Sequence, residues 1–90
     1  MNDFSEHKFN QGFPMVIDNE QLDEAISYLE MAKSKGVFAE AYIPYFNLGQ
    51  AYMMKGHLNK AIQELEEAVR LAPHNEKIPQ LLEMVKLSLN

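Results

Sequence analysis

Residues 45–73, YFNLGQAYMMKGHLNKAIQELEEAVRLAP, decide the fold of this 90-residue chain. Apolar residues recur at helical spacing on both sides of Gly56, which predicts two helices joined by a short turn. The small residues Gly49 and Ala61 would let the two helix backbones approach each other closely. Bulky side chains fill the remaining space, at Tyr45, Leu48, Tyr52 and Leu65. The stretch therefore predicts a closely packed pair of antiparallel helices.

The large and small residues of this stretch keep a fixed spacing: Tyr45-x2-Leu48-Gly49-x2-Tyr52, then Ala61-x3-Leu65-x2-Ala68, then Pro73. The spacing resembles the tetratricopeptide repeat, whose pattern is W-x2-L-G-x2-Y…A-x3-F…P. Tyr45 stands at the Trp position and Leu65 at the Phe position. The resemblance implies an all-α protein, in which antiparallel helical hairpins stack as a short right-handed superhelix. It also implies protein binding, with no cofactor and no enzymatic activity.

The second helix of this repeat has a copy earlier in the chain. The segment Ala25-Ile26-x2-Leu29-Glu30-x-Ala32 returns as Ala61-Ile62-x2-Leu65-Glu66-x-Ala68. Residues 19–36 are therefore interpreted as the back half of a preceding repeat, with Ala25 and Ala32 expected between packed helices. We expect a TPR-like domain over residues 19–90 and an irregular segment over residues 1–18. In that segment Pro14 interrupts any long helix, although a short helix over residues 3–11 is compatible with the sequence.

Start and stop signals predict where each helix begins and ends. Asp18 and Gln21 form a capping box, and Gly36 ends the helix that follows. Pro44 is tolerated only in a first turn, which sets the next helix start near Tyr42 or Ile43. The later boundaries are expected at Gly56, at Asn59 as the cap of the third helix, at Leu71 before Pro73, at Asn75 or Glu76, and at Leu89.

Composition excludes several other functions. The net charge of −5 argues against sequence-independent binding of nucleic acid. The chain has no cysteine, which excludes disulfides. No apolar run is long enough to span a bilayer, and the N-terminal residues lack the pattern of a signal peptide, so we expect a cytoplasmic protein. The histidines are far apart, which predicts no metal site, and no nucleophile motif supports catalysis. Glu64, Glu66 and Glu67 are expected on a solvated face.

The resemblance also suggests where a partner binds, because the first helix of each repeat lines a concave groove. The candidates are Ile43, Phe46, Asn47, Gln50, Met53 and Met54, together with Lys77 of the last helix. Alternatively, Ile43, Phe46 and Met53 pack against neighbouring helices. Asn47 and Lys77 match two positions of the carboxylate clamp of chaperone-binding family members. Leu81 stands where that clamp has an arginine, so the clamp is incomplete.

An apolar stripe on the first predicted helix needs a cover, because an isolated amphipathic helix is unstable. The stripe consists of Leu22, Ile26 and Leu29. The cover is the upstream segment with Phe4, Phe9, Phe13 and Val16, a second copy of the chain, or further repeats of a longer array. The expected function is an interaction module or adaptor that binds a peptide or helix. The alternative is a structural assembly unit that homodimerises through this stripe.

Overall fold

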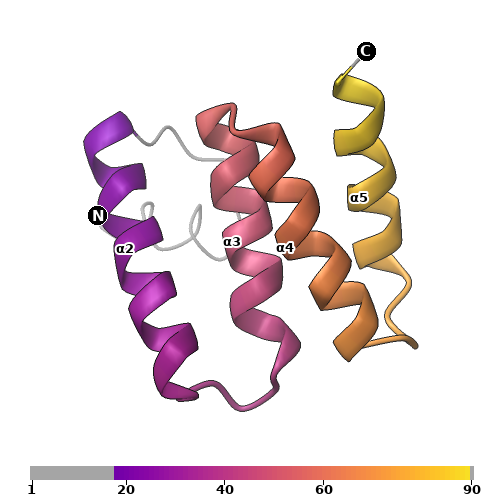
Figure 1. The fold of residues 1–90 in the computed structure, drawn as a ribbon, viewed down its shortest axis with the longest axis horizontal. Coiled ribbons are helices and arrows are strands. Elements are labelled where there is room, and N and C mark those ends of the chain that lie inside the picture. Colours follow the sequence, from indigo (N-terminus) through magenta and orange to yellow (C-terminus); the bar gives the residue numbers. More distant parts are fainter. Residues whose placement is uncertain (1–17, 90) are drawn as a thin grey trace, which may run out of the picture.

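The computed structural model describes residues 18–89, which form four α-helices without strands. They are α2 (Asn19–Lys35), α3 (Tyr42–Lys55), α4 (Leu58–Leu71) and α5 (Lys77–Ser88). Figure 1 shows them side by side in chain order, and each helix packs against the next. The all-α prediction of stacked helical hairpins is thereby confirmed. The predicted irregular segment over residues 1–18 lies outside the described residues except for Asp18, and its short helix and the aromatic cover lie wholly outside them.

The ends of α2 follow the predicted signals. The Gln21 amide donates to Asp18 Oδ1 at 2.8 Å, and the Asp18 amide donates to Gln21 Oε1 at 3.2 Å. This reciprocal pair is the predicted capping box, which satisfies two amides that the helix itself leaves free. At the other end, Gly36 has φ 66°, a left-handed conformation that glycine adopts without steric cost. Both boundaries are therefore confirmed.

The turn between α3 and α4 is tight and corrects one boundary. Gly56 has φ 85°, and the His57 amide donates to the Tyr52 carbonyl at 2.9 Å. The first backbone bond of α4 runs from the Ala61 amide to the His57 carbonyl, at 3.0 Å. Asn59 was predicted to cap this helix, and that prediction is wrong. The left-handed Gly56 reverses the chain so quickly that α4 begins at Leu58, which places Asn59 inside its first turn.

The start of α5 depends on Asn75. Its Oδ1 accepts hydrogen bonds from the Lys77 amide at 2.9 Å and from the Ile78 amide at 3.2 Å. This is the capping role predicted for Asn75 or Glu76. The helix ends at Ser88, one residue before the predicted Leu89.

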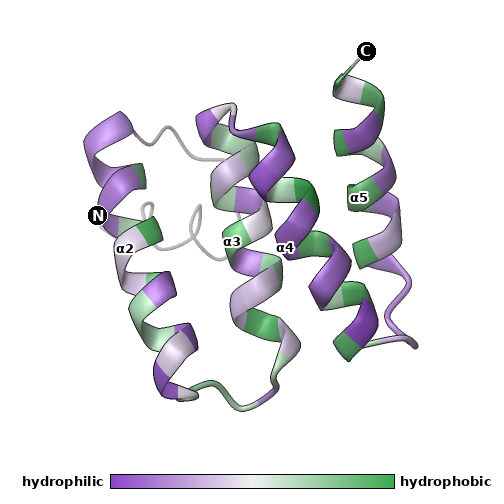
Figure 2. Ribbon diagram, viewed as in Figure 1, coloured by the Kyte–Doolittle hydropathy of each residue, from purple (hydrophilic) through white to green (hydrophobic). Residues whose placement is uncertain are grey.

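The core lies between α3, α4 and α5. Its buried members are Leu48, Tyr52, Ala61, Leu65, Ala68, Ile78 and Val85. A Cβ at Gly49 would lie 2.6 Å from both Cγ and Cδ2 of Leu65, so only hydrogen fits at this position. Figure 2 shows hydrophobic and hydrophilic residues alternating along α4, the pattern of a helix with one buried side. The predicted close approach of α3 and α4 is confirmed.

One predicted core position is wrong. Ala25 is exposed, whereas Ala32, Ala61 and Ala68 are buried. Ala25 occupies the same place in α2 that Ala61 occupies in α4. Ala61 is buried because α3 packs over it, and the described residues place no such helix over Ala25. The repeated sequence therefore forms a helix in both copies, but the described residues pack a neighbouring helix over Ala61 and not over Ala25.

Candidate protein-interaction surface

One side of α3 carries residues that are half-buried or exposed. Ile43, Asn47, Gln50 and Met54 follow each other at intervals of four, three and four residues, which places them on one helical stripe. The first three are half-buried, and Met54 is 49% exposed. We call these four residues the α3 stripe. It offers two side-chain amides, each with donors and an acceptor, between an apolar residue at either end.

The other two predicted groove residues of α3 lie elsewhere. Phe46 and Met53 are half-buried and pack against the core cluster. Of the six groove candidates on α3, four therefore form the α3 stripe and two pack against the core. Changing Phe46 or Met53 would alter the packing of the core as well as any surface.

Lys77, the remaining groove candidate, is exposed in the first turn of α5. The burial pattern indicates how α5 is oriented relative to α3. Pro44 and Ala51 are buried in α3, and the residues 34 positions later, Ile78 and Val85, are buried in α5. This shift equals the repeat length of the tetratricopeptide family, about 34 residues. In this register Lys77 takes the place in α5 that Ile43 takes in α3.

The predicted self-association stripe is largely covered. Leu22 is 4% exposed, and Ile26 and Leu29 are half-buried against the core cluster. The apolar side chains that α2 exposes are instead Tyr28, at 62%, and Met31, at 52%. They occupy the places that Glu64 and Glu67 take in α4, 36 residues later. The sequence analysis missed them, although comparison of the two copies could have found them as apolar residues at polar positions.

A polar cluster ties α2 to α3 and α4. Lys33 Nζ lies 3.1 Å from Glu30 Oε1, 3.2 Å from Glu64 Oε1 and 4.8 Å from the centre of the Tyr45 ring. The Tyr52 hydroxyl donates to Glu30 Oε2 at 2.7 Å. Glu64 was expected on a solvated face, and this is wrong, since it is half-buried and paired with Lys33. Spacing along one helix does not reveal an ion pair between two helices.

The cluster shifts the pKa values of its members. Burial raises the pKa of Tyr52 to about 12, and the hydrogen bond to Glu30 adds to this. Burial also raises the pKa of Glu64, although Lys33 opposes the shift. For Glu30, burial is outweighed by Tyr52 and Lys33, so its pKa lies below the ordinary value. Likewise, the carboxylates outweigh burial at Lys33 and raise its pKa. The cluster contains positive and negative side chains, and its salt bridge and hydrogen bonds link α2 to α3 and α4.

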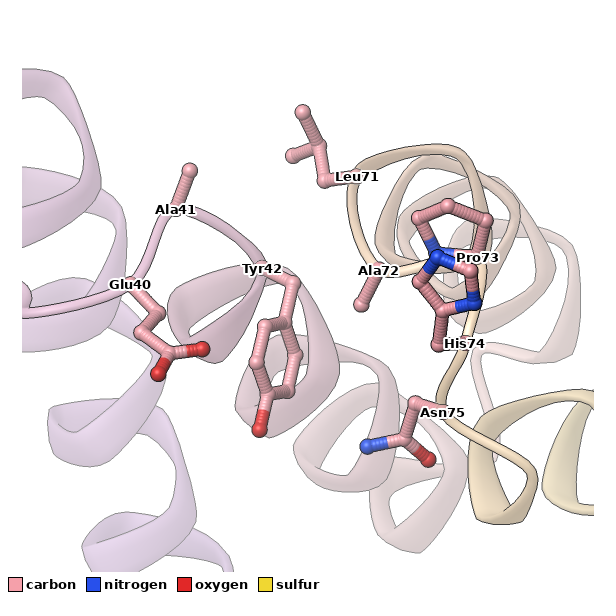
Figure 3. A pocket seen from close by; sticks show the side chains of 8 residues that line it. All are labelled: Glu40, Ala41, Tyr42, Leu71, Ala72, Pro73, His74 and Asn75. Carbon is pink, nitrogen blue, oxygen red and sulfur yellow. The ribbon is translucent and has the colours of Figure 1, made fainter.

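A pocket of 520 Å³ lies between the start of α3 and the connection from α4 to α5. Figure 3 shows the residues that line it, and the side chains of Tyr42 and Asn75 both point toward the lower part of the view. The lining residues are Glu40, Ala41, Tyr42, Leu71, Ala72, Pro73, His74 and Asn75. No local sequence signal predicts this pocket, because its walls come from two connections that are far apart in the chain. Its hydrogen-bonding side chains are the carboxylate of Glu40 and the side chains of Tyr42, His74 and Asn75.

Residues 18–89 hold neither a metal-ligand cluster nor a membrane-spanning helix. No group of three or more side chains of the metal-ligating types comes together there. No helix in that range is both long and apolar enough to cross a membrane.

Comparison with known proteins identifies the repeat. The family model of the tetratricopeptide repeat matches residues 43–75, which span α3, α4 and the turn after them. Comparisons with curated proteins and with solved structures found no match. The matched range contains the close approach of Gly49 to Leu65 and the left-handed Gly56 in the turn between α3 and α4. Residues 43–75 therefore match a tetratricopeptide repeat, and the packing of the four described helices is consistent with repeats of this kind.

Proposed function

We propose that this protein is an interaction module that binds a segment of another protein along the α3 stripe. Tetratricopeptide repeats generally mediate protein–protein interaction, and this chain contains one. The observation that supports the proposal is the stripe itself: Ile43, Asn47, Gln50 and Met54 follow one another at helical spacing within the matched repeat, and none of them is fully buried. The proposal requires no cofactor.

Each residue of the stripe has a distinct role in this proposal. Asn47 and Gln50 can donate to and accept from the polar groups of a bound segment, which fixes its position. Ile43 and Met54 contribute apolar contact, and the flexible Met54 adapts to different shapes. Lys77 adds a single positive charge at the start of α5. A single lysine is a weak anchor for a carboxylate compared with several converging donors, so we do not assign a carboxylate clamp.

Affinity capture with a tagged chain tests this proposal. The variant that combines Asn47→Ala, Gln50→Ala and Met54→Ala should lose the captured partner while its far-ultraviolet circular dichroism stays helical. Gln63→Ala changes an exposed residue of α4 and is the matched control, with partner recovery unchanged. Phe46 is left intact because it packs against the core. Equal recovery of partner by the triple variant and the native chain would refute binding through the α3 stripe.

The second candidate function is assembly through α2. Tyr28 and Met31 favour it, since both are more than half exposed on a helix whose copy, α4, carries glutamates there. Exposed apolar neighbours are typical of interaction surfaces. In this case sedimentation equilibrium should give a mass near twice 10.4 kDa, and Tyr28→Glu combined with Met31→Glu should return it to 10.4 kDa. A native mass of 10.4 kDa at micromolar concentration would exclude assembly as the function.

A further inference from the structure

Four exposed residues form a straight stripe on α2, which stands at one end of the row of described helices in Figure 1. They are Glu24, Tyr28, Met31 and Lys35. Their intervals of four, three and four residues place them on one side of the helix. Ile26 and Leu29, which pack against the core, lie on the opposite side, because each residue turns the helix by about 100°. We call the four exposed residues the α2 stripe, and it lies on the side of α2 away from α3.

The charges of the α2 stripe are arranged symmetrically. An acidic residue begins the stripe, two apolar residues form its centre, and a basic residue ends it. Glu24 and Lys35 lie equally far from its midpoint, which falls between Tyr28 and Met31. When a second copy of α2 lies antiparallel against this stripe, each Glu24 comes opposite a Lys35 and each Tyr28 comes opposite a Met31. The stripe is therefore complementary to itself, as an interface with two-fold symmetry requires.

The other charges of α2 are paired or lie beyond the stripe. Among the described residues, the salt bridges of α2 join Asp23 to Lys55 at 2.7 Å, and Lys33 to Glu30 at 3.1 Å and to Glu64 at 3.2 Å. Neither Glu24 nor Lys35 takes part in these pairs. Glu20 lies one turn before Glu24, so it adds negative charge at the end of the stripe that Lys35 of a second copy would meet.

A small pocket beside the stripe can receive a side chain. Its volume is 220 Å³, and it is lined by Tyr28, Met31, Ala32, Lys35 and Val37. In the antiparallel arrangement, Tyr28 of the second copy comes opposite Met31, at the edge of this pocket, and its ring would fill it. Removal of these aromatic and methionine side chains from water would stabilise the contact, and the end charges would fix its register.

The other end of the row of helices does not match α2. In the 34-residue register of the buried positions, Glu83 of α5 takes the place of Gly49 in α3. A Cβ at Gly49 would already lie 2.6 Å from Leu65, and Leu29 is the counterpart of Leu65 in α2. Glu83 would thus prevent α5 of one copy from packing on α2 of another as α3 packs on α4. This favours pairing between two equal α2 stripes over a head-to-tail stack.

We propose that two copies of the chain pair through their α2 stripes, with the helices antiparallel about a two-fold axis at the midpoint between Tyr28 and Met31. Glu24 of each copy forms an ion pair with Lys35 of the other. The inference rests on the second candidate of the proposed function, assembly through α2, and specifies its geometry. It does not use the α3 stripe, which each copy in the pair retains.

Charge exchange across the pair tests this geometry. Glu24→Lys brings lysines opposite each other, and Lys35→Glu brings glutamates opposite each other. Each single variant should weaken self-association on the order of tenfold, because like charges then face each other twice. The double variant, Glu24→Lys with Lys35→Glu, restores both ion pairs and should self-associate within about twofold of the native chain. Sedimentation equilibrium at micromolar concentration measures each dissociation constant, and far-ultraviolet circular dichroism checks that the variants stay helical.

Two further samples separate specific pairing from an effect of net charge. An equimolar mixture of the two single variants should form a heterodimer, because a stripe with two basic ends then meets a stripe with two acidic ends. Glu83→Lys makes the same change of charge at an exposed position of α5 and is the matched control, with native self-association. Added salt should weaken both the native pair and the mixed pair.

Several results would overturn the inference. A native mass of 10.4 kDa at micromolar concentration would mean that the copies do not pair. Equal self-association of the native chain and both single variants would place the contact on another surface. A double variant that stays as weak as the single variants would contradict the antiparallel arrangement. The Glu24→Lys variant keeps the α3 stripe intact, so its recovery of partner in the capture assay decides the proposed function separately.

Discussion

Helices α2 and α4 carry the same sequence pattern and end up in different surroundings. In α4, Ala61, Leu65 and Ala68 have no exposed surface. In α2 the corresponding residues are Ala25, which is exposed, Leu29, which is half-buried, and Ala32, which is 5% exposed. Both segments form regular helices. The difference shows that the pattern determines the helix, whereas burial depends on which helices lie beside it.

The same comparison separates the two outer surfaces. Tyr28 and Met31 are exposed on α2, whereas the corresponding residues of α4, Glu64 and Glu67, are half-buried. Glu64 also links α4 to α2, because it forms a salt bridge with Lys33. At these paired positions α4 thus carries half-buried carboxylates beside a fully buried core, whereas α2 carries exposed apolar side chains and buries its core positions less completely. Four experiments measure how far this difference extends.

The largest difference is expected between Leu65→Ala and Leu29→Ala. Leu65 is fully buried against Gly49, so its truncation leaves a cavity and should lower the free energy of unfolding by about 3 to 4 kcal/mol. Leu29 is half-buried, and its truncation should cost about 1 kcal/mol. Urea denaturation followed by circular dichroism measures both. Equal losses would mean that the two copies are equally packed.

The next difference concerns enlargement at the paired alanines. Ala61→Leu should lower the free energy of unfolding by about 2 to 3 kcal/mol, because the extra atoms have no space between α3 and α4. Ala25→Leu places the same atoms in an exposed position, and its effect should stay within about 0.5 kcal/mol. Thermal melts of the two variants provide the comparison. A loss at Ala25 as large as that at Ala61 would show that a further segment covers α2.

Alkaline pH tests the polar cluster that ties the two helices together. Tyr52 has a pKa of about 12 in the folded chain against an ordinary 10.0, so the fold favours the neutral phenol. Its contribution is complete below pH 10 and is lost as the pH rises toward 12. Lys33, whose pKa is also raised, loses its contribution in the same direction. The urea midpoint should therefore fall above pH 10. Tyr52→Phe should cost about 1 kcal/mol at pH 8 and reduce the alkaline fall. A fall of unchanged size in this variant would rule out Tyr52 as its source.

The smallest effect on stability is expected from Tyr28→Glu combined with Met31→Glu. Both side chains are mostly exposed, so the free energy of unfolding should change by about 0.5 kcal/mol or less. The variant copies onto α2 the acidic residues that α4 carries at these places. Differential scanning calorimetry at low concentration measures the change. A loss of several kcal/mol would mean that these side chains pack against something in the folded chain.

The sequence predicted the fold well because its signals are local. The capping box of Asp18, the left-handed Gly36 and Gly56, and the Gly49–Leu65 approach each depend on residues close together or on one known spacing. The cap of α4 was misplaced, because the geometry of a tight turn decides whether Asn59 lies before or inside the helix. Phe46 and Met53 could not be separated from the α3 stripe, since all are apolar or amide residues on one helix. The Lys33–Glu64 pair joins two helices and leaves no local signal.

Photo-crosslinking from two positions compares the two surfaces directly. A benzophenone amino acid is placed at Met54 in one variant and at Met31 in another, and each is irradiated together with the captured partner. Binding through the α3 stripe predicts an adduct between the Met54 variant and the partner protein, with none from the Met31 variant. An adduct formed only from the Met31 variant, whether with the partner or with a second copy of the chain, would contradict binding through α3.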